Sequence, residues 1–97
     1  MSITFIATLI VKPGKEAEFE RLQKELSEDS HRTEPDLIAY DVIRHRDQPQ
    51  TYVVYARFKD QAAFDLHMAA PSHDRLVPPI LACLAQDMDL QFYDWKS

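Results

Sequence analysis

Two histidines, His67 and His73, are the side chains of this sequence best suited to move a proton near neutral pH. If His67 faces a pocket between helices and sheet, it can act as a general base toward a phenol or an enol. The electron-rich anion that remains can pass an electron to oxygen directly, without a flavin or a metal. The structural alternative is a histidine on the flank of a helix that bonds a neighbouring carbonyl.

His73 and Arg57 are candidates for holding a substrate. His73 follows Pro71-Ser72 at the start of a helical stretch, where it either lines the mouth of the pocket or only helps to cap the helix. Arg57 lies on a predicted strand, and a strand arginine that points into a cavity can bind a carboxylate, a phosphate or a quinone oxygen. The alternative is an ion pair at the sheet edge with an acid such as Asp41, which is the role we expect for Arg44.

Aromatic side chains make up 10% of the chain. We expect Tyr40, Phe58 and Phe64 to line a pocket for a planar aromatic substrate. The alternative is that the aromatic residues pack in a core or between two copies of the chain, and most of them should do so. The wider set is Tyr40, Tyr52, Tyr55, Phe58, Phe64, Phe92 and Trp95.

Composition excludes several classes of protein. The chain has 97 residues, which suits a single domain spanning 1–97, and its formal net charge is −5. An acidic chain without a basic run is not expected to bind nucleic acid or an anionic membrane. The N-terminus resembles no signal peptide, and no apolar run approaches the ~20 residues of a membrane-spanning helix, so we expect a cytoplasmic protein.

The sequence also lacks the residues that common cofactor and metal sites require. The single glycine, Gly14, cannot form a glycine-rich phosphate loop, and the single cysteine, Cys83, cannot form an intrachain disulfide or a cysteine-rich zinc site. A metal held by His67 and His73 would need a third ligand, and the other two histidines lie in other predicted elements. We therefore expect neither a cofactor nor a metal.

The hydrophobic pattern predicts the element order β-α-β-β-α(α)-β. This is a ferredoxin-like α+β fold, in which a four-stranded antiparallel sheet carries its helices on one face. We expect Pro78-Pro79 to break or kink the third helical stretch. The predicted strands are 3–11, 37–44, 51–58 and 88–95, and the predicted helices are 13–30, one that opens at Lys59-Asp60, and one from about Ser72.

The first strand carries large apolar side chains on both faces, although helices can cover only one face of the sheet. An apolar sheet face of this size is rare on a monomer. We therefore expect a two-fold homodimer that packs sheet against sheet, with a monomer that exposes a moderately apolar face as the alternative.

Several segments, in this order, resemble the antibiotic biosynthesis monooxygenase (ABM) family, which includes small quinol monooxygenases of the dimeric α/β barrel group. The resemblance covers nearly the whole chain. It implies a cofactor-independent monooxygenase that acts on a small hydroquinone or phenol, with His67 as its base. The segments are KPGKEAEF, Glu34-Pro35, LIAYDVIR with Tyr40, and YVVYARFKDQAAFDLHMAAPSH with His67 and His73.

The chain departs from the family pattern at informative places. Asp36 stands where the family usually has glycine, and Ala56 stands where a strand glutamate is usual. If that glutamate orients the helix histidine in relatives, His67 must find another partner here. The sequence has no asparagine, and its single tryptophan, Trp95, is at the end of the last predicted strand, which argues against the haem-degrading branch. The missing asparagine also argues against members that act on polycyclic phenols.

Two other functions remain open from the sequence. One is an isomerase of a small phosphorylated or carboxylated keto compound, in which a histidine would drive enolisation and an arginine would hold the anion. The other is a non-catalytic dimer that binds a small aromatic ligand, a reading that the missing strand glutamate favours.

Overall fold

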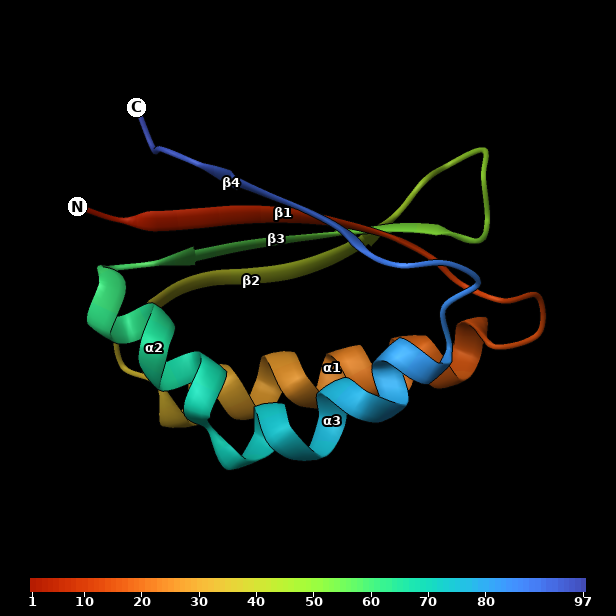
Figure 1. The fold of residues 1–97 in the computed structure, drawn as a ribbon, viewed down its shortest axis with the longest axis horizontal. Helices are drawn as coiled ribbons and strands as arrows, with labels where there is room; N and C mark the ends of the chain where they lie inside the picture. The colour runs from red at the N-terminus through yellow and green to blue at the C-terminus, as the bar shows by residue number, and fades with distance from the viewer.

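The computed structural model describes all 97 residues and contains one antiparallel sheet of four strands in the order β2-β3-β1-β4 (Figure 1). The strand order and the crossover helices are those of the predicted ferredoxin-like α+β fold, which the structure confirms. The elements are β1 (Ile3–Ile10), α1 (Glu16–Thr33), β2 (Leu37–Arg44), β3 (Thr51–Phe58), α2 (Gln61–Ala69), α3 (Pro71–Ala82) and β4 (Asp89–Tyr93).

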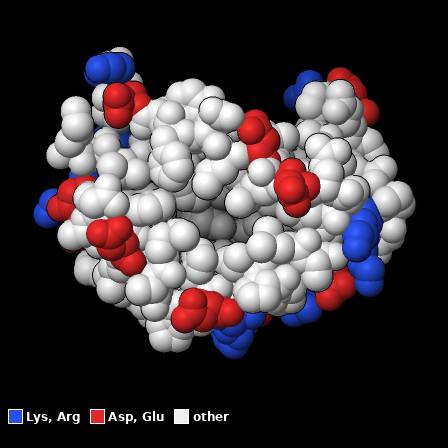
Figure 2. Space-filling view, in the orientation of Figure 1, with Lys and Arg blue, Asp and Glu red and all other residues white.

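The molecule has two layers. All three helices lie on one side of the sheet, and no helix covers the other side (Figure 1). We call these the helix-covered face and the open face. On the side of the molecule where β4, α2 and α3 lie in front, the surface is hollowed between the two layers (Figure 2).

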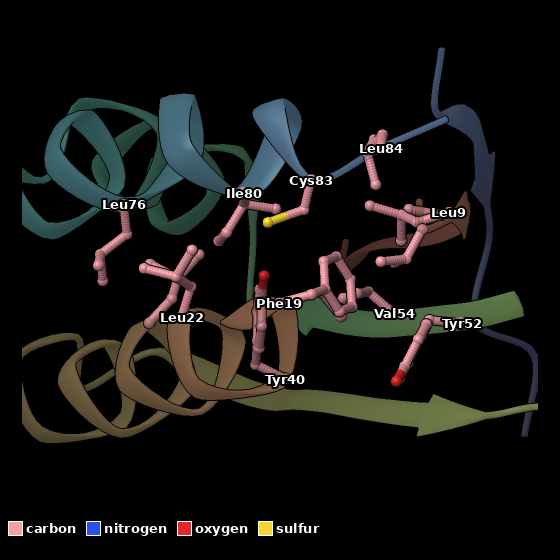
Figure 3. Packing of buried hydrophobic residues seen from close by; sticks show 14 of the residues in the cluster. Leu9, Phe19, Leu22, Tyr40, Tyr52, Val54, Leu76, Ile80, Cys83 and Leu84 are labelled. Atoms are coloured by element: carbon pink, nitrogen blue, oxygen red, sulfur yellow. The ribbon is translucent and has the colours of Figure 1, made fainter. Parts of the chain in front are cut away.

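The core fills the space between the helices and the sheet. Alternate residues of β3 point into it, because successive side chains of a strand project to opposite faces. Tyr52 and Phe58 are fully buried there, and the Tyr52 ring packs 4.7 Å from the ring of Phe19 on α1. Leu76 and Ile80 reach the same core from α3 (Figure 3). The core thus packs α1 and α3 against the sheet.

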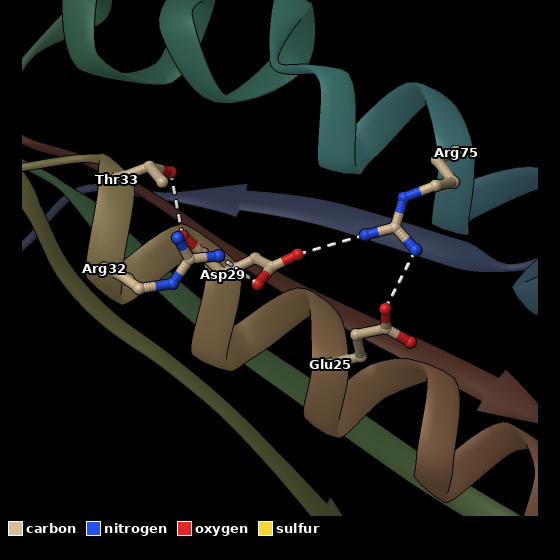
Figure 4. Close-up of polar contacts among 5 residues, drawn as sticks. All are labelled: Glu25, Asp29, Arg32, Thr33 and Arg75. Atoms are coloured by element: carbon tan, nitrogen blue, oxygen red, sulfur yellow. Dashed lines mark hydrogen bonds and ion pairs between the residues drawn. The ribbon is translucent and has the colours of Figure 1, made fainter.

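An ion-pair network holds α3 against α1 at the surface (Figure 4). The Arg75 guanidinium donates to Glu25 at 2.8 Å and to Asp29 at 3.1 Å, and Asp29 also accepts from Arg32. Exposed ion pairs contribute about 0–1 kcal/mol each, so this network fixes the relative position of two helices more than it stabilises the fold.

The ends of some elements differ from the predicted ones. α1 begins at Glu16 rather than Pro13, because Gly14 adopts a positive φ of 87° and closes a turn before the helix. α3 runs unbroken through Pro78 and Pro79, so the predicted break is wrong. The two prolines remove the N–H groups that would bond the carbonyls of Asp74 and Arg75, and both of these residues face solvent, where water can bond the freed carbonyls.

Two helix ends position His67 and Glu34. Helix α2 begins at the predicted place, directly after Lys59-Asp60, with Asp60 as its N-cap, and the Asp60 carboxylate accepts the N–H of Ala63 at 2.9 Å. The helix ends after nine residues, and His67 lies in its last turn. Glu34 is the C-cap of α1, and its backbone N–H donates to the backbone carbonyl of Ser30.

Candidate functional site

An apolar cavity of about 110 Å³ lies between the sheet and the helices. Thirteen of its sixteen lining residues are hydrophobic, and the other three are Gln23 from α1, His67 from α2 and His73 from α3. An engineered cavity of about 150 Å³ holds one benzene ring, so this space suits a single ring and not a fused ring system. The other lining residues are Phe5, Ala7, Leu9, Leu26, Tyr40, Val54, Phe64, Met68, Val77, Ile80, Leu81, Met88 and Leu90.

His67 is paired with Glu34. Its Nδ1 lies 3.0 Å from Oε1 and 3.2 Å from Oε2 of that carboxylate, and the two residues are 2% and 5% exposed. An ionised carboxylate only accepts hydrogen bonds, so Nδ1 carries the hydrogen and donates it. In a neutral imidazole the lone pair is then on Nε2, which no protein group engages. This arrangement prepares Nε2 to accept a proton.

His67 is also held between rings. Phe58 lies 5.1 Å away, Tyr40 5.6 Å away and His73 5.3 Å away, measured between ring centroids. Burial, and then the charge of His67, lower the pKa of His73 below its ordinary value. This lowering favours the neutral form of His73.

The structure brings together four of the six residues predicted to contact substrate. His67, His73, Tyr40 and Phe64 line the cavity. Phe58 does not line it, because the ring is fully buried behind His67 and Phe64, 5.4 Å from the latter. Phe58 therefore supports the cavity wall.

Arg57 lies outside this site. Its neighbours on β3, Ala56 and Phe58, face the helices, so strand alternation turns Arg57 to the open face. There its guanidinium stacks 3.7 Å from the centre of the Trp95 ring. The expectation that Arg57 binds substrate beside His67 is not met within one protomer.

Glu34 takes the place that sequence reasoning assigned to a missing acid. The family position on β3 is Ala56, which is completely buried beneath the helices. Glu34 comes from a different element, 33 residues before its partner His67. From the sequence, Glu34-Pro35 was one of the segments that resemble the family, but Glu34 was given no role beside His67, because no local pattern links residues so far apart.

Gln23 was also missed, although the sequence carries a signal for it. Gln23 lies four residues after Phe19 and three before Leu26, which places it on the buried stripe of α1. The side chain is 3% exposed, and its Oε1 accepts the Tyr40 hydroxyl hydrogen at 3.0 Å. A polar residue on an apolar helical stripe is the kind of departure that marks a site.

Tyr40 and Gln23 form a wall between two spaces. Both line the apolar cavity, and both also line an open, polar groove of about 530 Å³ between α1 and β2. Burial, and then the negative charge of Glu34, raise the pKa of Tyr40 well above its ordinary value, so the hydroxyl keeps its proton.

The remaining histidines lie apart from the cavity. Nδ1 of His45 accepts the backbone N–H groups of Asp47 and Gln48 in the β2–β3 turn, and His31 is exposed near the end of α1. No three His, Cys, Asp or Glu side chains gather as a metal site would need. None of the helices has the length and apolar character to cross a membrane.

Comparison with known proteins identifies relatives of this architecture. The family model described as antibiotic biosynthesis monooxygenase matches residues 2–78. A crystal structure of an antibiotic biosynthesis monooxygenase is 33% identical, with a TM-score of 0.88, and the match covers 98% of this chain and 99% of that one. A conserved protein from Methanosarcina mazei Go1 is 27% identical, with a TM-score of 0.92 and coverage of 99% and 94%. No curated protein matches the chain.

Proposed function

Since this chain belongs to the antibiotic biosynthesis monooxygenase family, we propose that it oxidises a small, uncharged hydroquinone or phenol with molecular oxygen and without a cofactor. The observation that carries the proposal is the His67–Glu34 pair at the wall of an apolar cavity sized for one ring. Glu34 directs Nδ1, which leaves Nε2 of His67 as the base for a substrate hydroxyl.

The chemistry begins with transfer of the hydroxyl proton to Nε2. The Glu34 carboxylate, 3.0 Å from Nδ1, stabilises the imidazolium that forms. The phenolate then gives an electron to oxygen, and the two radicals combine at a ring carbon. For a hydroquinone, loss of water leaves a hydroxyquinone that keeps one oxygen atom, and the other oxygen atom leaves in the water. All electrons come from the substrate, so the reaction needs no added reductant.

The cavity lining separates this proposal from the isomerase. An isomerase of a phosphorylated or carboxylated keto compound needs a cation at the anionic group. The polar groups of the lining are one amide, two imidazoles and the Tyr40 hydroxyl, with no Lys or Arg among them, and Arg57 is on the open face. Around the hollow in Figure 2, acidic and uncharged side chains gather, and Lys and Arg lie toward the edges of the view. These features favour an uncharged substrate.

We also propose that the protein works as a homodimer that buries the open face. Large apolar side chains of this face are exposed in the protomer: Ile43 is 60% exposed, Tyr93 50% and Trp95 47%. A second copy that packs sheet against sheet would cover them and would leave the helix-covered face, with its cavity, at the outside.

Oxygen uptake tests the function. The purified, metal-stripped protein is given a panel of single-ring hydroquinones and phenols, beside His67→Gln and the control His45→Gln. We expect substrate-dependent uptake that falls about 10²–10⁴-fold in His67→Gln, the usual contribution of a general base, and is unchanged in the control. Uptake no faster than autoxidation for every substrate contradicts the proposal. Ligand binding that survives without any turnover would instead support the non-catalytic binder.

A further inference from the structure

The buried amide of Gln23 has an unused donor. Its Oε1 accepts from the Tyr40 hydroxyl, but its Nε2, with two N–H groups, meets no acceptor in the protein. The residue is 3% exposed, but Nε2 is not one of the fully buried polar atoms that lack a partner, which are Thr4 Oγ1, Ser30 Oγ and Arg57 Nε. Nε2 therefore reaches accessible space along the cavity and groove that Gln23 lines. A ligand oxygen in the cavity would give this donor the acceptor that the protein does not provide.

The orientation of the amide is fixed by Tyr40. The Ser27 hydroxyl donates to the backbone carbonyl of Tyr40 at 2.9 Å, and the Tyr40 ring packs against His67. Because the Tyr40 hydroxyl keeps its proton, it donates to Oε1 and leaves the N–H groups of Gln23 as the end offered to a ligand. His67 contacts the ring of Tyr40 whereas Gln23 contacts its hydroxyl, so the two polar groups meet different parts of one side chain.

We propose that Gln23 determines substrate specificity: its Nε2 donates to a second oxygen on the ring whose first hydroxyl faces His67. The site would then select a single aromatic ring that carries two oxygen substituents over a monophenol of the same size. The role of His67 in this pairing rests on the proposed function, but the selection itself is a property of binding. Because Gln23 offers a donor, the second oxygen only needs to accept a hydrogen bond.

Binding without oxygen tests this selection. Under anaerobic conditions, calorimetry compares hydroquinone, 4-methoxyphenol and 4-methylphenol, which share a hydroxyl and differ at the opposite ring position. We expect the first two to bind roughly five- to tenfold more tightly than 4-methylphenol, as one net hydrogen bond predicts. In Gln23→Leu this ratio should fall to about one, with the affinity for 4-methylphenol retained. Gln61→Leu, at an exposed position on α2, should keep the wild-type ratio.

Three outcomes overturn the proposal: equal affinity of the wild-type protein for hydroquinone and 4-methylphenol, a ratio that persists in Gln23→Leu, or no measurable binding of any of the three. The wild-type comparison alone keeps the proposal falsifiable if Gln23→Leu does not fold, and Gln23→Met offers a side chain of closer shape. A protein that shows the ratio but no oxygen uptake would keep the Gln23 assignment and contradict the monooxygenase. Oxygen uptake by a protein that binds hydroquinone and 4-methylphenol equally would support the monooxygenase and contradict the Gln23 assignment.

Discussion

The two faces of the sheet differ in what they do with the same strands. On β3, Val54 and Phe58 face the helices and are buried, whereas Tyr55 and Arg57 face the open side and remain partly accessible. The helix-covered face encloses the cavity with His67. The open face carries apolar surface and one arginine–tryptophan stack.

We therefore assign the proposed reaction to the helix-covered face and the proposed dimer contact to the open face. Gln23, His67 and His73 line the cavity from the three helices, and the sheet adds one polar group, the hydroxyl of Tyr40 on β2, to an otherwise apolar wall. The open face contributes no residue to the cavity, so a change there should act on the proposed dimer and not on the site. The two faces can therefore be perturbed one at a time.

The largest expected effect comes from truncating one residue on each face. Phe58→Ala leaves a cavity in the core and should lower the free energy of unfolding by about 3–5 kcal/mol at every protein concentration. Tyr55→Ala, on the open face, should lower the melting temperature mainly at low protein concentration, because it should weaken the proposed dimer. Calorimetry over a hundredfold range of concentration, with sedimentation for the oligomeric state, measures both.

The outcome has a clear reading. A melting temperature that does not depend on concentration in the wild-type protein or in Tyr55→Ala, together with a monomer in sedimentation, contradicts the dimer. It leaves the helix-covered face and its cavity as described.

A smaller effect is expected from the partner of the histidine. Glu34→Gln keeps the shape but loses the charge, so it no longer stabilises the imidazolium or secures the Nδ1 hydrogen. We expect kcat to fall by at least about 10- to 100-fold, the loss typical for the carboxylate partner of a metal-bound histidine, with little change in KM. Glu28→Gln, an exposed change on the same helix, is the matched control.

The pH profile distinguishes positioning from general damage. A merely structural role would lower activity equally at all pH values, whereas loss of the carboxylate should shift the acidic limb of the kcat/KM profile toward lower pH. An unchanged profile in Glu34→Gln contradicts the positioning role.

The fold was predictable because its signals are local. Strands β2 and β3 have the predicted bounds, since Glu34-Pro35 and the turn at 46–50 interrupt the pattern on either side of them. The N-cap at Asp60 was equally visible. The prolines of α3 misled the prediction, because whether a proline breaks a helix depends on the solvation of the carbonyls it frees, which the sequence does not report.

The site was predictable only in part, since its key contact is tertiary. His67 stood out as a candidate by residue type, but its pairing with Glu34 depends on how the end of α1 meets the last turn of α2. Arg57 was assigned to the site because a strand arginine can point into a cavity, and the sequence does not report which face of β3 the helices cover. Gln23 shows the converse, because its helical spacing puts it on the buried stripe of α1 although its residue type suggested no chemistry.

The smallest expected effect concerns His73, which lies on the helix-covered face. Its lowered pKa makes the free energy of unfolding depend on pH. In the folded protein His73 binds a proton less readily than in the unfolded chain, so unfolding takes up protons as the pH falls through about 6.5. The free energy of unfolding should therefore decrease from pH 8 to pH 5.5, by less than about 1 kcal/mol, because the side chain is only partly buried and solvent screens it. Urea denaturation at both pH values should show a smaller decrease for His73→Gln than for the wild type, whereas exposed His31→Gln should match the wild type. An equal decrease in His73→Gln and the wild type would show that His73 does not contribute to the pH dependence of the free energy of unfolding.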